Sequence, residues 1–313
     1  MPKRQSLILV FVIALLIIGC GGNDDSSGGR LDDGQFNIVA TTGMITDMVE
    51  NIGGDEVVVA GLMGPGVDPH LYKAGAGDVS LMSYADLIVY NGLHLEGAMT
   101  SVFEKMSSKT KTLGLGDQLD PALLIATSES GGLHDPHIWF DVSLWMKTIP
   151  IVRDALIEID PENKALYTAN ARNYAATLDS LDSYVRSQAE KIPPGQRVLV
   201  TAHDAFNYFG RAYGFEVRGL QGISTAAEAG TGDVQELARF IASRKIPALF
   251  IETSVPRRNI EAVQAAVRSR GFEVTIGGEL FSDAMGNPDT PEGKYVGMVK
   301  HNIDTIVNSL LGE

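Results

Sequence analysis

Six histidines and a single cysteine are the side chains in this 313-residue sequence best suited to bind a transition metal. Three of the histidines, His70, His137 and His203, occur beside proline or directly after an apolar run. Neutral imidazoles bind divalent ions, and they also transfer protons in hydrolytic enzymes. A lone thiol, Cys20, forms neither an internal disulfide nor a thiolate cluster. The chemistry to consider is therefore metal binding through imidazoles, with or without catalysis.

Each of these three histidines stands where a fixed backbone can present its ring. His70 and His137 both follow an Asp-Pro pair, in GPGVDPH and HDPHIWFD, and proline restricts the backbone beside the ligand. His203 directly follows the strand-like run RVLVTA, and ligands of open α/β sheets bind at the carboxyl ends of strands. One such histidine is more typical of a structural residue, but three in similar contexts predict a shared metal site.

The other histidines and the acidic neighbours of the ligands have weaker claims. We expect His134 to lie at the rim of the site or to act as an alternate ligand, and His94 and His301 to be structural or exposed. A carboxylate can orient an imidazole through its other nitrogen, or it can simply cap a turn. Three residues are open to either role: Asp68, Asp135 and Asp204. Glu252, at the end of a predicted strand, is a further candidate for orienting a ligand.

Short apolar runs alternate with longer amphipathic segments, as expected of parallel sheets in an α/β protein. The predicted strands are 36–42, 57–63, 87–91, 197–202, 215–220, 248–253 and 272–276. The predicted helices of the second half are 233–245, 258–270 and 292–311. Because 313 residues exceed what one hydrophobic core usually supports, we expect two lobes, each with a mainly parallel sheet flanked by helices.

The segment between the two α/β runs has helical periodicity from Pro161 to Lys191. Pro161 suits a first helical turn, and the sequence PPG at 193–195 ends the helix. A helix of about 30 residues spans roughly 45 Å, which is long enough to join two lobes. The predicted organisation is an N-terminal lobe at 36–160, a rigid interdomain helix at 161–192 and a C-terminal lobe at 193–313.

The N-terminus has the features of a bacterial export signal. Lys3 and Arg4 precede the apolar run Leu7–Ile18, which is of signal-peptide length and short for a membrane span. The following Ile-Gly-Cys resembles the lipobox of bacterial lipoproteins, in which the cysteine is lipidated and becomes the new N-terminus. We predict a signal peptide at 1–19 and, at 20–35, a lipidated Cys20 with a flexible glycine-rich tether. The alternatives are a plain secretory signal or a short membrane anchor.

The net charge of −14 makes nucleic acid an unsuitable partner, because an acidic surface repels phosphate backbones. The simplest role of that charge is solubility. With 44% apolar and 20% charged residues, the composition is that of an ordinary globular protein.

Several motifs occur in the order found in one known family. They are GPGVDPH at 64–70, ADLIVYNGLHLE at 85–96, DPHIWFD at 135–141, TAHDAFNYF at 201–209 and GGELFSDAM at 277–285. On these motifs the chain resembles the solute-binding lipoproteins of bacterial zinc and manganese ABC importers, from Phe36 to the C-terminus. The resemblance implies a metal site of His70, His137, His203 and Asp283, buried between two lobes, and it matches Pro161–Lys191 to the family's interdomain helix.

The same resemblance implies a function. The protein would bind Zn2+ or Mn2+ outside the cytoplasm and deliver it, as transported ligand, to the membrane subunit of an ABC permease. It would be a monomer held by Cys20 to a bacterial membrane, in the periplasm or on the outer face of the cell membrane. Three imidazoles and one carboxylate leave no coordination position for a catalytic water, which favours a carrier over an enzyme.

The choice of metal is less sharply indicated. Imidazole-rich sites bind Zn2+ more tightly than Mn2+, so we expect tighter zinc binding in vitro. In the family, glutamate at the third ligand position often accompanies manganese, whereas His203 stands there in this sequence. Many zinc-specific relatives carry a long histidine-rich loop before the second ligand motif, and the matching stretch 126–134 has a single histidine. Either metal therefore remains open as the physiological cargo.

Two other functions remain as alternatives. The sequence HDPH superficially resembles hydrolytic metal motifs, but a hydrolase needs an open coordination position and a base near the bound water. The motif HExxH is absent from the sequence. Surface lipoproteins of this type can also act as adhesins, and no sequence feature tests that role.

Overall fold

The computed structural model describes residues 35–127 and 133–312. The predicted signal peptide at 1–19, Cys20 and nearly all of the tether therefore lie outside the described residues. Within the described part of the chain, no helix combines the length and apolar character needed to cross a membrane.

The first sheet is parallel throughout, with strand order β2-β1-β3-β4. Its strands are β1 (Phe36–Ala40), β2 (Val57–Gly61), β3 (Leu87–Tyr90) and β4 (Lys111–Gly114). The helices that accompany it are α1 (Gly43–Gly53), α2 (Ala76–Tyr84) and α3 (Thr100–Met106). The three predicted strands of this half are confirmed, whereas β4 is an addition. We call this part of the molecule the first lobe.

The second half contains two parallel strand pairs, β5-β6 and β7-β8. Their bounds are β5 (Val198–His203), β6 (Glu216–Gln221), β7 (Ala248–Glu252) and β8 (Thr275–Leu280). Helices α7 (Asn207–Tyr213), α8 (Thr231–Arg244) and α9 (Arg258–Arg268) flank them. Strands β5 and β7 lie side by side, and the carboxylate of Glu252 accepts the backbone amides of Ala202 and His203. We call this part the second lobe.

Strand β8 lies further along the chain than the predicted strand 272–276. It begins at Thr275 and continues through Gly277 and Gly278. A Cβ atom at these glycines would come within 2.6 Å of Ser309 and Thr305, so glycine lets helix α10 (Tyr295–Leu311) approach the strand. The prediction failed because the apolar run stops before the strand does.

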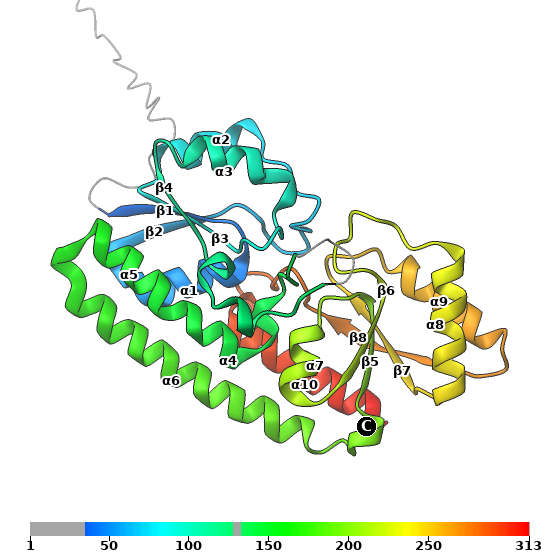
Figure 1. The fold of residues 1–313 in the computed structure, drawn as a ribbon. Coiled ribbons are helices and arrows are strands. Elements are labelled where there is room, and N and C mark those ends of the chain that lie inside the picture. The colour runs from blue at the N-terminus through cyan, green and yellow to red at the C-terminus, as the bar shows by residue number, and fades with distance from the viewer. Residues whose placement is uncertain (1–34, 128–132, 313) are drawn as a thin grey trace, which may run out of the picture.

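Helix α6 (Lys164–Ala189) extends beneath both lobes as a single rod of 26 residues (Figure 1). A 3-10 turn at Pro161–Asn163 precedes it, so the predicted long helix is confirmed with slightly shorter ends. Its buried face recurs at helical spacing: Tyr167, Ala171, Tyr174, Leu178, Leu181, Val185 and Ala189. Helices α4 (Val142–Trp145) and α5 (Ile149–Ile159) complete the connection from the first lobe.

One hydrophobic core runs continuously from the first sheet through α6 to α10. Helix α10 packs against β8 and also against α6 and α1, so the last helix contacts elements of both lobes. A second core lies between β5–β8 and helices α8 and α9, and a third covers the outer face of the first sheet. The division into 36–160, 161–192 and 193–313 remains our proposal for the domain organisation.

Candidate metal centre

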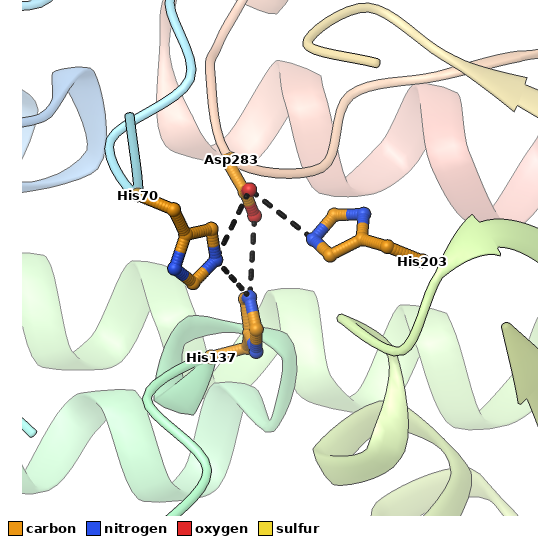
Figure 2. Close-up of side chains that lie close together, drawn as sticks. All are labelled: His70, His137, His203 and Asp283. Carbon is orange, nitrogen blue, oxygen red and sulfur yellow. Dashed lines mark hydrogen bonds and ion pairs between the residues drawn. The ribbon is translucent and has the colours of Figure 1, made fainter. Parts of the chain in front are cut away.

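Four buried side chains from four separate segments meet between the lobes (Figure 2). His70 lies in the loop after β2, and His137 immediately precedes a 3-10 turn at Ile138–Phe140. His203 is the last residue of β5, and Asp283 lies in the loop after β8. Their ligand atoms all lie within 4.8 Å of one another. The structure thus brings together all four residues predicted from the sequence and the resemblance.

The separations of the donor atoms suit a small tetrahedral ion. The Nε2 atoms of His70 and His137 are 3.3 Å apart, and Nε2 of His203 lies 3.2 Å from Oδ2 of Asp283. The carboxylate lies 3.6 Å from His70 and 3.5 Å from His137. With metal–ligand bonds of about 2.0–2.1 Å, a regular tetrahedron has edges of about 3.3–3.4 Å. One zinc-sized cation at the centre would satisfy all four donors.

Burial gives these atoms a reason to share a cation. His137 and His203 are fully buried and Asp283 is 1% exposed. Both carboxylate oxygens of Asp283 and Nε2 of His203 lack a hydrogen-bond partner among the described residues. Leaving buried polar atoms without a partner costs about 1–3 kcal/mol each, so a cluster of them is costly unless an ion binds there.

Two of the three imidazoles are oriented by a buried carboxylate. Nδ1 of His137 lies 2.7 Å from Oδ1 of Asp135, and Nδ1 of His203 lies 2.5 Å from Oε2 of Glu252. Each ring therefore donates Nδ1–H to a carboxylate, which leaves the Nε2 lone pair free for a metal. The roles suggested for Asp135 and Glu252 as orienting residues are confirmed by these contacts.

The other two acidic neighbours have different contacts. Asp68 accepts the backbone amide of His70 at 2.8 Å through Oδ1, which closes a turn at the ligand. Asp204 accepts the amide of Gly219 at 2.6 Å, while the imidazole of the adjacent His203 is bonded to Glu252. For these residues the turn-capping alternative is the one that the geometry supports.

The electrostatics of the centre favour a divalent cation. Burial alone lowers the pKa of His203, but the carboxylates of Glu252 and Asp283 on either side of the ring outweigh it and raise that pKa well above 6.5. Burial opposes ionisation of Asp283 too, yet the facing histidines, His203 foremost, hold its pKa below the usual value. Burial lowers the pKa of His70 to about 3, so this ligand is neutral at physiological pH.

The remaining histidines stay outside the centre. His94 and His134 line the wall of a cleft of about 890 Å3 that lies between the lobes and reaches His70. His134 is therefore a rim residue, as expected. Far from the cleft, Nε2 of the half-exposed His301 lies 3.0 Å from the carbonyl oxygen of Glu279.

Sequence reasoning missed contacts that tie the ligand loops to the opposite lobe. Trp139, two residues after His137, was interpreted as a core residue; it is buried, but its indole Nε1–H also donates to the carbonyl of Ser282 at 3.1 Å. Tyr208 donates its hydroxyl to the carbonyl of Asp135 at 2.9 Å. The one sequence signal was the placement of aromatic residues with polar atoms close to the ligands.

Comparison with known proteins follows this geometry. A family described as zinc-uptake complex component A, periplasmic, matches residues 38–309. The zinc-binding protein TroA of Treponema pallidum is 53% identical over 278 residues, which are 89% of this chain and 90% of TroA. Its solved structure superimposes with a TM-score of 0.87, covering 88% of this chain and 99% of that one.

Two lipoproteins are similar over nearly their whole length. The manganese-binding lipoprotein MntA of Bacillus subtilis is 43% identical over 98% of this chain and 99% of its own. The manganese ABC transporter substrate-binding lipoprotein PsaA of Streptococcus pneumoniae is 30% identical over 99% of both. The family match covers most of the chain, and the centre has the donor set expected of a metal carrier. The chain therefore belongs to the ZnuA family of metal-binding proteins of zinc and manganese importers.

Proposed function

We propose that this protein binds one Zn2+ or Mn2+ ion outside the cytoplasm and delivers it to an ABC importer. The observation that carries the proposal is the buried set of His70, His137, His203 and Asp283, whose donor spacing matches a four-coordinate ion. Because four protein donors fill the coordination sphere of Zn2+, the site is suited to holding a cargo. The family is one of solute-binding transport components, so the hydrolase alternative is set aside.

Zinc should bind more tightly than manganese in vitro. Three imidazoles favour Zn2+ by the ordinary order of affinities, whereas the carboxylate of Asp283 could accommodate Mn2+ by binding through both oxygens. The relatives support both cargoes, since TroA is described as zinc-binding and MntA as manganese-binding. We therefore propose zinc or manganese as the cargo, chosen in the cell by availability as much as by affinity.

The membrane attachment is proposed through Cys20, after removal of residues 1–19. Both MntA and PsaA are described as lipoproteins, which supports a lipid anchor and an extracytoplasmic location. The description of PsaA as an ABC transporter component supports a permease as the partner. Cys20→Ala should release the protein from the membrane fraction, and retention of membrane association would refute the anchor.

Metal content and calorimetry test the binding function directly. The soluble domain from Phe36 onward, stripped with chelator, should take up one equivalent of Zn2+ and one of Mn2+ at the same site. His137→Ala should lower the Zn2+ affinity more than tenfold, whereas His301→Ala, a histidine away from the centre, should leave it unchanged. Absence of stoichiometric binding of either metal to the unaltered protein would overturn the proposal.

A further inference from the structure

The four ligands of the centre are not held equally. His137 and His203 have Asp135 and Glu252 behind their rings, but among the described residues no carboxylate supports the second nitrogen of His70. Figure 2 shows that nitrogen turned away from the other three side chains. His70 is also the ligand that lines the cleft, and it is 8% exposed, whereas the other three are at most 1% exposed. Solvent and an incoming ion therefore reach the centre on the His70 side.

The loop of His137 is bonded to the second lobe at several points. Asn207 and Tyr208 of α7 donate to the side chain and carbonyl of Asp135, at 3.1 and 2.9 Å. The bond from Trp139 to Ser282, described above, adds a link to the loop of Asp283. These contacts fix the position of His137 whether or not an ion is bound.

The loop of His70 meets the second lobe through a different and more exposed contact. The hydroxyl of Thr225 donates to Oδ2 of Asp68 at 2.6 Å, while Oδ1 of the same carboxylate accepts the amide of His70. Thr225 is buried, and Asp68 is half-buried. One carboxylate thus joins the ligand's own backbone to the opposite lobe.

Thr225 lies in the loop after β6, and this loop is attached to the strand that carries His203. Gln221 ends β6 and pairs with His203 in the parallel ladder. The side-chain amide of Gln221 donates to the carbonyl of Ala227 at 3.1 Å, which closes the loop around Thr225. The position of Thr225 therefore follows that of His203, across the cleft from His70.

We propose that His70 is the exchangeable ligand of the centre and that the Thr225–Asp68 hydrogen bond is the latch that holds it in place. This proposal rests on the proposed function, because it concerns loading and release of the same ion. Opening the latch frees the loop at the cleft, and the ion loses His70 while the other ligands stay fixed. A three-coordinate ion facing the cleft can then leave by ligand exchange.

The latch is tested by removing one hydroxyl. Thr225→Val keeps the size of the side chain, and Zn2+ release to an excess of chelator, followed by stopped flow, should be about tenfold faster, as expected for loss of one hydrogen bond to a carboxylate. The matched control is Thr253→Val, since the buried hydroxyl of Thr253 has no hydrogen-bond partner among the described residues. The control should release Zn2+ within twofold of the unaltered protein, and thermal unfolding of both metal-free variants checks that they are folded.

A double variant tests whether the latch acts through His70. In a His70→Ala background, Thr225→Val should leave the release rate unchanged within twofold, because the ligand that it holds is gone. If Thr225→Val accelerates release equally in both backgrounds, the hydrogen bond closes the lobes in general and the proposal is wrong. Equal release rates for Thr225→Val and the unaltered protein would also overturn it. Failure of the proposed function gives a different result, namely no Zn2+ bound by the unaltered protein.

Discussion

The indole of Trp139 donates a hydrogen bond to the carbonyl oxygen of Ser282, so the residue two positions after His137 is bonded to the residue just before Asp283. The carbonyl of Trp139 in turn accepts the hydroxyl of Tyr295, from α10. Two ligand loops that are more than 140 residues apart in the sequence are thereby fixed to one another. Their spacing is set by the protein before any ion arrives, which lowers the cost of ordering the site on binding.

Replacing Trp139 by phenylalanine should weaken Zn2+ binding about tenfold, because the ring remains but the link to Ser282 is lost. The molecule offers a matched control in Trp145, which is also buried but whose Nε1 has no hydrogen-bond partner among the described residues. Trp145→Phe should lower thermal stability without changing the affinity. Competition titration with a chelator of known affinity measures both, and equal losses of affinity would show that the indole bond has no special role.

Glu252→Gln should lower Zn2+ affinity by about 10–100-fold, the range usual for outer partners of metal ligands. Glutamine still accepts the amides of Ala202 and His203, but its NH2 group cannot accept Nδ1–H from the imidazole. His203 then favours the tautomer with its proton on Nε2, the atom that binds the metal. Isothermal calorimetry gives the affinity, and Asp304→Asn, at a carboxylate that accepts only from the distant Tyr184 among the described hydrogen bonds, is the control. Unchanged affinity in Glu252→Gln would contradict this role.

Zinc affinity should rise about tenfold per pH unit between pH 5 and 7. In the metal-free protein the flanking carboxylates, Glu252 first, outweigh burial and raise the pKa of His203, so this ring carries an extra proton throughout that range. His70, with a pKa of about 3, is already neutral there. Each bound ion therefore displaces one proton. The sequence alone suggested a loss of affinity only below about 6.5, the ordinary histidine value.

Calorimetry in buffers of different ionisation enthalpy counts this released proton directly. The His203→Ala variant should bind weakly and with little dependence on pH over the same range. An affinity of the unaltered protein that is flat between pH 5 and 7 would be inconsistent with a protonated His203.

Removing the metal should lower the thermal stability of the whole protein. An ion at 1,000 times its dissociation constant stabilises a folded protein by about 4 kcal/mol, because it binds the folded state alone. Differential scanning calorimetry with Zn2+ and then with excess chelator should show one cooperative transition that moves to lower temperature. His301→Ala should retain the metal-dependent shift, whereas Asp283→Ala should lose it; a shift that survives in Asp283→Ala would place the stabilising ion elsewhere.

The fold was largely predictable because buried parallel strands are short apolar runs, and such runs are visible in the sequence. Strand β4 was missed because its sequence KTLG contains little apolar surface, and β8 was misplaced because its glycines are chosen for the approach of α10. Local patterns report burial, but they do not report which helix packs on which strand.

The candidate site was only partly predictable from the residues themselves. His70, His137 and His203 stood out by their positions after strands and prolines, whereas Asp283, one of 39 acidic residues, was indicated only by the family motif. The roles of Glu252 and Asp68 could not be decided from sequence, since each depends on a partner brought close by the fold. Asp68 and Thr225, for example, are 157 positions apart.

The hydrophobic core that passes without a break from the first sheet through α6 to α10 limits how this molecule can announce its cargo. Swinging the lobes widely apart would expose that shared core to water, a large cost compared with the binding of a single ion. The loaded and empty forms must therefore differ mainly in detail around the cleft. A receptor that distinguishes them has to sense the rim of the centre, because the outline of the protein carries little of that information.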